Sequence, residues 1–343
     1  MRILVLLFSF VFLSCKSTYK VVERKDIVLD SVSIRAITAV NGGVWFGGTN
    51  SKAGFISFAT DSETKIVKLQ NEKTDFRSMG YNGMDILLIN AGSPANMYKM
   101  RTYANNCAFS LVYSESGEKV FYDSMFIYPK NGLGIVIGDP TEDCLSILLT
   151  EDSGETWNKI PCANLPKTVE GEAAFAASDT NVKIVDGVIF IISGGKKSRL
   201  FKSSDKGKTW EVFETPITQG EAMTGAFSMD FFNEKKGIIV GGNYDQQKDN
   251  SKNKAITKDG GKTWKLLAEN EAFGYASCVQ FMPESNGKVI YTCGTSGVYY
   301  STNSGKKWHK LLEDTDFYTL RFSSKKHIYL AGRNKVTKIK ISH

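Results

Sequence analysis

Residues 150–157 of this 343-residue chain read TEDSGETW, and close copies of this octapeptide occur three more times. The copies are SSDKGKTW at 203–210, TKDGGKTW at 257–264 and STNSGKKW at 301–308. Four of the five Trp residues end a copy, and successive copies are 53, 54 and 44 residues apart. Repeats at such a period are typical of folds that use one supersecondary unit many times. The octapeptide therefore decides the architecture before anything is said of function.

Each copy lies between two β-rich segments, which predicts a hairpin turn. Asp152 can accept hydrogen bonds from backbone N–H groups one to three residues further on, and Gly154 can take the positive φ that such a turn needs. Trp157 begins the outgoing strand and offers a large apolar face to a neighbouring unit. In the fourth copy Asn303 replaces the Asp, and Asn can hold the same turn. The equivalent residues are Asp205, Gly207 and Trp210; Asp259, Gly261 and Trp264; and Asn303, Gly305 and Trp308.

The octapeptide resembles the Asp-box, also called the bacterial neuraminidase repeat. In β-propellers this motif joins the third and fourth strands of a blade, so the resemblance implies an all-β propeller. With four strands to a blade, we expect blades at about 31–69, 76–122, 123–161, 172–214, 226–268 and 275–312. Three strands follow, and the N-terminal segment YKVVERKDIVL can supply a fourth, which closes the ring with both termini and removes an open edge. We therefore expect seven blades, with six or eight as alternatives.

The first 15 residues, MRILVLLFSFVFLSC, contain one Arg, an apolar run and then Ser14-Cys15. This pattern is typical of a secretory signal, and its end resembles a bacterial lipobox. We expect a lipoprotein signal peptide at 1–15 and a single propeller domain at 16–343, anchored by acyl chains on Cys15. This interpretation predicts a cell-envelope location, periplasmic or surface-exposed. An ordinary cleaved signal with an incidental Cys15 is the alternative.

The cysteines of an exported protein meet an oxidising compartment and can pair. Cys278 and Cys293 are symmetric about the turn PESNGK, and Cys144 and Cys162 are symmetric about Ser153. Opposed residues of antiparallel strands lie within disulfide reach at non-hydrogen-bonded pairs. We expect at least one bridge, with four buried thiols as the alternative. No Cys or His spacing is that of a metal site.

Beyond the octapeptide, nearly the whole chain resembles a family of Bacteroidetes propeller proteins. The stretches that carry the likeness include SIRAITAVNGGVWFGGT, FRSMGYNGMDILLINAGSPANMYK, GIVIGDP and NLPKTVEGEAAFAASDTN. The family is related to the photosystem II assembly factor propellers and more distantly to sialidases and sortilin. Its members are often called oxidoreductases or glycosyl hydrolases. The sequence does not support the first name, because no Gly-rich loop opens a helix and no haem or flavin signature is present, so no cofactor is expected.

Propellers bind ligands in or above the central channel, where the innermost strands begin. Three Arg residues are expected at equivalent positions there, and Asp123 and Glu172 at comparable ones. Glu170 lies two residues before Glu172, so the two acids can share a face of an extended segment. Such a ring can bind a carboxylate or a peptide C-terminus bidentately. The alternative is that Arg and acidic residues pair across blades. The expected ligand-binding residues are Arg35, Arg77, Arg321, Glu170 and Glu172.

We therefore expect a membrane-anchored monomer that binds a protein or an anionic ligand at its central mouth, with a role in assembly or scaffolding. The net charge of +7 is spread along the chain without a Lys/Arg run, so nucleic acid is not an expected partner. A sialidase-like glycosidase is an alternative, with Glu172 and Tyr275 as weak catalytic candidates. A purely structural module of a surface complex is a third possibility.

Overall fold

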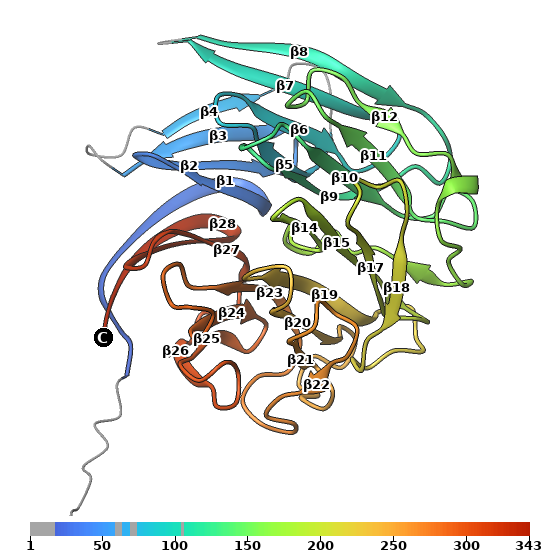
Figure 1. The fold of residues 1–343 in the computed structure, drawn as a ribbon. Coiled ribbons are helices and arrows are strands. Elements are labelled where there is room, and N and C mark those ends of the chain that lie inside the picture. The colour runs from blue at the N-terminus through green and yellow to red at the C-terminus, as the bar shows by residue number, and fades with distance from the viewer. Residues whose placement is uncertain (1–17, 59–63, 69–73, 104–105) are drawn as a thin grey trace, which may run out of the picture.

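The computed structural model describes residues 18–58, 64–68, 74–103 and 106–343. Strands make up nearly all regular structure in these ranges, and one short 3-10 helix, η1, spans Cys162–Asn164. The sheets stand side by side around a central axis, and the two ends of the described chain lie next to each other at the edge of the ring (Figure 1). The all-β propeller predicted from the repeat is confirmed.

The strands of the described ranges form six hydrogen-bonded sheets. Four sheets have four strands each, which run in this order from the axis to the rim: β5 (Phe76–Tyr81), β6 (Ile86–Asn90), β7 (Ala95–Tyr103) and β8 (Asn106–Glu115); β9 (Tyr122–Ile127), β10 (Gly134–Gly138), β11 (Ser146–Thr150) and β12 (Asn158–Lys159); β14 (Val182–Val185), β15 (Val188–Ile192), β17 (Arg199–Ser203) and β18 (Glu211–Glu214); β23 (Ala276–Phe281), β24 (Ile290–Gly294), β25 (Gly297–Ser301) and β26 (His309–Leu312).

The other two sheets have six strands each. One contains β19 (Thr224–Phe231), β20 (Gly237–Asn243), β21 (Lys254–Thr257) and β22 (Lys265–Leu266), extended by β16 (Gly194–Gly195) and β13 (Glu172–Ala173). The other joins the two ends of the chain in the order β27 (Phe317–Ser324), β28 (His327–Ser342), β1 (Lys20–Val40), β2 (Gly43–Gly48), β3 (Lys52–Ser57) and β4 (Thr64–Lys68).

The prediction of seven blades is wrong, because one strand belongs to both the first and the last group of strands. β1 is 21 residues long. Its residues Lys20–Val28 pair with β28, and Ile34–Val40 pair with β2. The two groups are thereby one continuous sheet, which contributes both β1 and β27 to the wall of the channel.

Two of the expected blade boundaries also differ. SESGEK at 114–119 was expected to join the third and fourth strands of a blade, but its first two residues end β8, the fourth strand, where they pair with Asn96 and Ala95 of β7. Glu172 was expected to open the fourth blade. Instead β13 pairs with β16 in the neighbouring sheet, and β14 is the innermost strand of its own sheet.

The second strand of each sheet is buried on both faces, because every sheet packs between two neighbours. The sequences ILLIN of β6, GIVIG of β10 and VIFII of β15 are buried at every position. Apolar runs without alternation are the pattern expected for strands covered on both sides. The core thus lies between sheets, and the ends of the strands are left to form the two faces of the ring.

The octapeptide turns join strands at the rim and share a set of hydrogen bonds. Oδ1 of Asp152 accepts from Thr150 Oγ1 at 2.6 Å and from the Thr156 N–H at 3.0 Å, and Oδ2 accepts from Thr156 Oγ1 at 2.6 Å. The Gly154 N–H donates to Thr150 Oγ1 rather than to the carboxylate. Gly154 has a φ of 87°, and a Cβ there would lie 2.5 Å from Leu87 of the neighbouring sheet. Similar bonds hold the turns at Asp205, Asp259 and Asn303.

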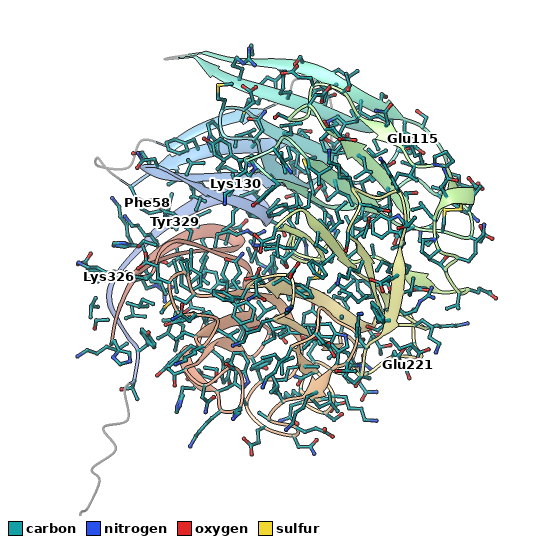
Figure 2. The ribbon with its side chains drawn as sticks, viewed as in Figure 1. Phe58, Glu115, Lys130, Glu221, Lys326 and Tyr329 are labelled. Carbon is teal, nitrogen blue, oxygen red and sulfur yellow. A yellow bond between two sulfur atoms is a disulfide. The ribbon has the colours of Figure 1, made fainter. Side chains whose placement is uncertain are left out.

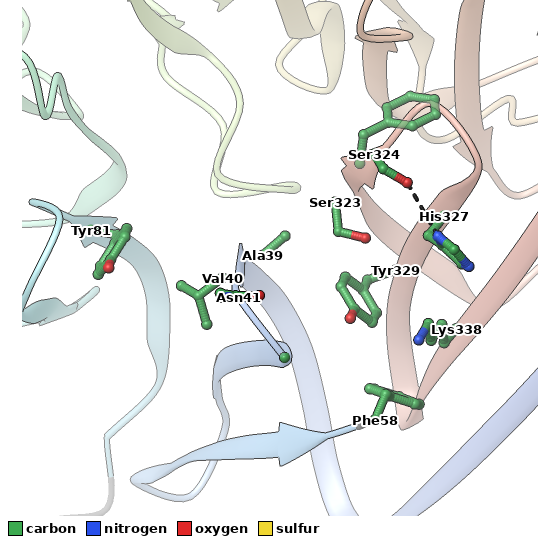
Figure 3. A pocket seen from close by; sticks show the side chains of 12 residues that line it. Ala39, Val40, Asn41, Phe58, Tyr81, Ser323, Ser324, His327, Tyr329 and Lys338 are labelled. Carbon is green, nitrogen blue, oxygen red and sulfur yellow. Dashed lines mark hydrogen bonds between the residues drawn. The ribbon is translucent and has the colours of Figure 1, made fainter. Parts of the chain in front are cut away.

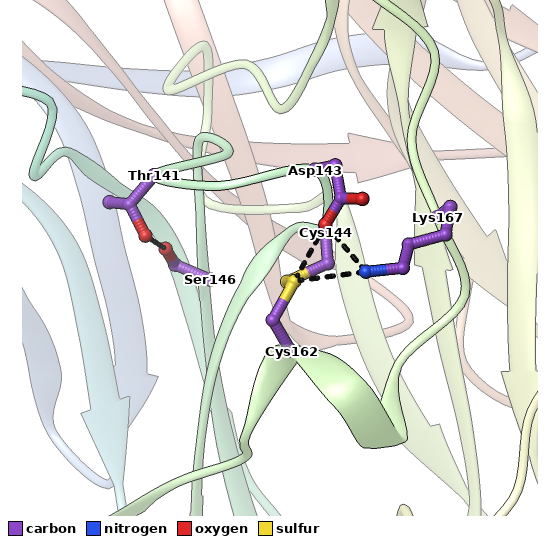
Figure 4. The surroundings of a disulfide bond; sticks show 6 residues. All are labelled: Thr141, Asp143, Cys144, Ser146, Cys162 and Lys167. Carbon is purple, nitrogen blue, oxygen red and sulfur yellow. Dashed lines mark hydrogen bonds and ion pairs between the residues drawn. A yellow bond between two sulfur atoms is a disulfide. The ribbon is translucent and has the colours of Figure 1, made fainter.

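One of the two expected cysteine pairs is joined. A disulfide connects Cys144, before β11, to Cys162 of η1, and Asp143 and Lys167 lie beside it (Figure 4). Cys278 and Cys293 lie opposite each other on β23 and β24, as their symmetry predicts, but both are buried free thiols.

Candidate functional site

The innermost strands other than β14 share a β-bulge near one end of the channel, whereas β14 pairs with β15 in regular register. In β1, Ile34 pairs with Gly48 and Ala36 with Gly47, which leaves Arg35 as an extra residue. A bulge takes its extra residue out of the ladder and redirects the side chain, often toward a site. The extra residues of β5, β9, β19, β23 and β27 are Arg77, Asp123, Phe227, Ser277 and Tyr318.

The sequence around each bulge explains its geometry. The extra residue is followed by a small buried residue, and a Gly commonly faces the bulge from the next strand. A Cβ at Gly138 would lie 2.2 Å from the carbonyl oxygen of Phe121, and one at Gly332 would lie 1.8 Å from that of Asp316. Only a residue without a side chain allows this approach. The small buried residues are Ala36, Ser78, Ser124, Ser228, Cys278 and Thr319.

A segment of four residues, Ala177–Thr180, crosses the channel below the bulges; we call it the axial segment. Its centre is Asp179, which is 5% exposed. The Asp179 carboxylate accepts hydrogen bonds from the Met79 N–H at 2.9 Å and from the Met125 N–H at 2.8 Å, and so joins β5 to β9. Ser124 Oγ donates a third bond, at 3.1 Å.

Three more of the innermost strands, β19, β23 and β27, bind the axial segment through its backbone and hydroxyl groups. The Ser178 carbonyl accepts from Thr319 Oγ1 of β27 at 3.0 Å, and Ser178 Oγ donates to the carbonyl of Ser277 in β23. The Thr180 carbonyl accepts from the N–H of Met229 in β19 at 2.9 Å. The axial segment therefore closes the channel and leaves a cup at the bulged end.

The cup has a volume of about 410 Å³, and Ala173–Ala177 lie along its floor. Two of its charged residues, Arg35 and Arg77, come from the bulges of β1 and β5. Asp123 comes from the bulge of β9, and Asp139 directly follows β10. The cup therefore has a basic half and an acidic half, which meet where β5 packs against β9.

The basic half contains two guanidinium groups with few partners. Arg35 donates to the carbonyl of Ala177 at 3.1 Å and lies 4.5 Å from the ring centre of Tyr318. Burial and the neighbouring Arg77 lower the pKa of Arg35. Arg77 approaches the Asp75 carboxylate only to 3.6 Å. By contrast, Arg24 and Arg101 each make two bonds to one carboxylate. Both cup Arg residues thus keep donors for a ligand.

The acidic half consists of two adjacent carboxyl groups. Asp123 is 1% exposed, and burial together with the neighbouring Asp139 raises its pKa well above the usual range. Burial also raises the pKa of Asp139 to about 6, although a hydrogen bond from the Ala174 N–H opposes this shift. Neighbouring carboxyl groups in one site resist joint ionisation. Sequence reasoning missed Asp139, whose signal was its place directly after the second-strand Gly in GIVIGDP.

Aromatic rings form another part of the cup wall. Phe175 and Phe227 are stacked with centroids 3.9 Å apart, and Tyr275 meets Phe227 edge to face at 4.8 Å. Tyr244, from the polar segment 241–254, packs edge to face on Tyr275. The Tyr275 N–H donates a 2.9 Å hydrogen bond to the Gln247 carbonyl and so joins this segment to the wall. The wall offers a flat apolar surface beside the charges.

Arg321 does not belong to the cup. It lies three residues beyond Tyr318, the bulge residue of β27. Its guanidinium donates to the carbonyls of Ser178 and Asp179 at 3.2 and 3.0 Å. Arg321 therefore holds the axial segment. The prediction that Arg321 is equivalent to Arg35 and Arg77 is wrong, because Tyr318 and not Arg321 occupies the bulge of β27.

The predicted acids Glu172 and Glu170 are also absent from the cup lining. Glu172 is 3% exposed, accepts from both arms of the Arg199 guanidinium and from Ser193, and so has its hydrogen bonds satisfied. Glu170 is exposed beside it. Tyr275 does line the cup, but burial raises its pKa, and Glu172 is engaged elsewhere. The structure therefore does not bring together the Tyr–Glu pair that the glycosidase alternative requires.

A second cavity, of about 620 Å³, opens at the other end of the innermost strands, between the β1–β2 turn and the β27–β28 turn (Figure 3). Phe58 and Tyr329 line it with ring centres 5.2 Å apart, and they lie together near the edge of the ring in Figure 2. His327 Nδ1 bonds to Ser324 Oγ, and Lys338 lies over the Phe58 ring. His327 and Tyr81 already have hydrogen-bond partners, and among the described residues no acidic residue or Arg lines this cavity, so the cup is the better candidate.

Within the ranges that the structure describes, no group of three or more His, Cys, Asp or Glu residues is placed to hold a metal ion. No helix in those ranges is long and apolar enough to cross a membrane. Cys15 lies outside the described residues, so the lipid anchor stays a prediction.

Comparisons with known proteins agree with the architecture. A family model described as Sortilin, neurotensin receptor 3, matches residues 145–278. No curated protein matches the chain. YCF48 bound to D1 peptide is similar at 13% identity and a TM-score of 0.66, over 95% of this chain and 100% of that one. The chain has the fold of a β-propeller.

Other solved propellers are similar to the same extent. YCF48 from Cyanidioschyzon merolae has 13% identity and a TM-score of 0.64, over 92% of this chain and 98% of that one. U3-55K has 13% identity and a TM-score of 0.65, over 94% of this chain and 100% of that one. At such low identity these likenesses show the fold alone, and the function has to be argued from the cup.

Proposed function

We propose that this propeller is a binding protein whose cup takes a carboxylate group of a polypeptide partner. The observation that carries the proposal is the pair Arg35 and Arg77, which two bulges direct into one cavity without a full ion pair for either. A planar guanidinium matches a carboxylate bidentately, and two of them fix its orientation. The similar structure of YCF48, bound to a D1 peptide, is consistent with peptide binding by this fold.

We further propose that the protein is a monomer in the cell envelope, held at a membrane by lipid on Cys15, and serves in assembly or as a scaffold. The support is the signal and lipobox pattern of residues 1–15 and the similarity to YCF48 propellers. The residues that the structure describes begin at Thr18, three residues after Cys15. The N–H of Tyr19 donates to the Tyr300 hydroxyl at the edge of the ring. A short tether would therefore keep the propeller near the lipid surface. Growth in labelled palmitate followed by mass analysis of the N-terminal peptide tests this, and an unmodified N-terminus would refute it.

The binding proposal is tested with two degenerate tetrapeptide pools, one with free C-terminal carboxylates and the other amidated. Wild-type protein should bind the carboxylate pool about tenfold more tightly in calorimetry, and Arg35→Ala/Arg77→Ala should lose this preference. The matched control is Lys208→Ala/Lys262→Ala, which removes the same charge from exposed rim residues. Equal binding of the two pools, or an unchanged preference in the Arg variant, would refute the proposal.

A further inference from the structure

One oxygen of the Asp123 carboxyl, Oδ2, has no hydrogen-bond partner among the residues that the structure describes. The backbone N–H groups of Ala176 and Asp139 lie close to this carboxyl, but the Asp139 N–H donates its hydrogen bond to the Phe121 carbonyl. The Asp123 Oδ2 is also buried. Buried polar atoms are nearly always paired, because leaving one unpaired destabilises the fold. An exception inside a cavity indicates a group that a ligand completes.

Asp139 extends this acceptor site toward the opening of the cup. It lines the same cavity and accepts one bond, from the Ala174 N–H. The backbone fixes its position, because the Asp139 N–H donates to the Phe121 carbonyl at 2.9 Å beside the close approach of Gly138. Two carboxyl groups from β9 and from the end of β10 therefore present several free acceptor sites together.

A cationic donor is the chemical partner of such a pair. An ammonium group carries three donors and no acceptor, and it removes the repulsion between two carboxylates. The basic half of the cup, Arg35 and Arg77, lies on the neighbouring innermost strands. The aromatic wall of Phe227 and Tyr275 offers a surface for the apolar stem of a lysine. The cup is thus built for a group with both signs of charge close together.

We infer that the cup recognises the carboxyl end of a peptide that carries a lysine there, with the ammonium on Asp123 and Asp139 and the carboxylate on Arg35 and Arg77. The carboxylate half of this inference rests on the proposed function. The acidic half is a separate subsite that selects among peptides.

Two carboxylate peptide pools that differ only in the last residue, lysine or norleucine, test the inference. Wild-type protein should bind the lysine pool about tenfold more tightly, as expected for a charge pair shielded from water. Asp139→Asn should bind the lysine and norleucine pools with equal affinity. Glu142→Gln removes a charge from an exposed position on the same loop and should keep the preference. Thermal melting of each variant checks that it is folded. Asp139 rather than Asp123 is substituted because Asp123 is fully buried, so that changing it would alter the fold as well as the cup.

The outcomes separate the inference from the proposed function. Equal affinity of wild type for the two pools, or a preference that survives Asp139→Asn, overturns the inference. If the inference is overturned but norleucine peptides still bind and Arg35→Ala/Arg77→Ala abolishes their binding, the proposed function stands without the lysine subsite. If an amidated lysine pool binds as well as the acid pool and depends on Asp139, the acidic subsite stands and the carboxylate proposal fails.

Discussion

The rim turns and the axial bulges are both repeated features of this propeller, but they repeat different things. The four turns repeat the side chains: an Asp or Asn, a Gly and a Trp in nearly the same hydrogen bonds. The six bulges repeat the backbone and vary the extra residue, which is Arg, Asp, Phe, Ser or Tyr. Where side chains repeat they serve stability, and where only the backbone repeats the side chains are free to form a site.

The largest effect on stability should come from the axis, at Asp179. Asp179→Ala leaves the buried N–H groups of Met79 and Met125 without an acceptor, and it places Ala at a φ of 58°. We expect a loss of about 3–5 kcal/mol in the free energy of unfolding, measured by urea denaturation. The Met79 and Met125 N–H groups bond to different oxygens of Asp179, so Asp179→Asn keeps only one of the two acceptors and should cost less than Asp179→Ala while still destabilising the fold. Equal losses in the two variants would show that the hydrogen bonds to Asp179 are not what holds the channel closed.

At the rim the expected loss is smaller and leaves binding unchanged. Asp152→Ala removes the acceptor for the N–H and hydroxyl of Thr156, which resembles the loss of a helix cap, and should cost about 1–2 kcal/mol. Asn303→Ala is the matching substitution in the fourth turn. It should cost less free energy of unfolding than Asp152→Ala, because Lys307 donates only its backbone N–H to Asn303 and has no hydroxyl group to donate. Calorimetry with the carboxylate peptides should be unaltered in both. A loss of binding with intact stability would mean that the rim, not the axis, carries the site.

The same contrast explains how far the sequence could predict the molecule. Rim turns are visible because their residues are fixed by local hydrogen bonds, and Gly154 takes the positive φ that was expected of it. The opposition of Cys278 and Cys293 followed from counting residues about a turn. The continuation of β1 from one group of strands to the next was not visible, because no local signal marks where a regular strand changes its partner.

Only part of the site was predicted, because local sequence patterns mark where a strand begins but not its register relative to the bulge. Arg35 and Arg77 were found because they begin apolar strands, whereas Arg321 was misplaced because its distance from a bulge depends on register. A signal was present: Arg77, Asp123 and Phe227 are each followed by Ser-Met. Aligning β5, β9 and β19 on this pair assigns the bulge residues of these three strands from the sequence alone. Asp139 is specified by Gly138, whose role appears only when the bulge facing it is known.

The pH dependence of the free energy of unfolding should differ between the carboxyl group of Asp139 in the cup and that of Asp152 at the rim. Burial raises the pKa of Asp139 from 3.8 to about 6, so the folded state disfavours the ionised carboxylate. The resulting loss in the free energy of unfolding is absent below pH 4 and complete above pH 6. Asp139→Asn should therefore stabilise the fold by about 1–2 kcal/mol at pH 8 and by almost nothing at pH 4. At Asp152 burial is outweighed by bonds from Thr150 and Thr156, which lower the pKa to about 2. Its contribution should persist to pH 4 and be lost only as the pH falls toward 2. Urea titrations at the two pH values measure both effects, and a pH-independent gain at Asp139 would contradict the assignment.

The smallest effect on stability, and the clearest separation of stability from function, is expected at Arg77. Its contact with Asp75 is 3.6 Å long and about one-third exposed, and surface pairs of this kind contribute about 0–1 kcal/mol. Arg77→Ala should therefore change the free energy of unfolding by less than about 0.5 kcal/mol while it weakens carboxylate binding. Arg77→Lys keeps the charge but not the planar fork, so it should restore only part of the affinity. Because Arg77 occupies a bulge that the backbone forms without it, a large loss of stability in Arg77→Ala would show that the extra residues hold the bulges, and the contrast between axis and rim would fail.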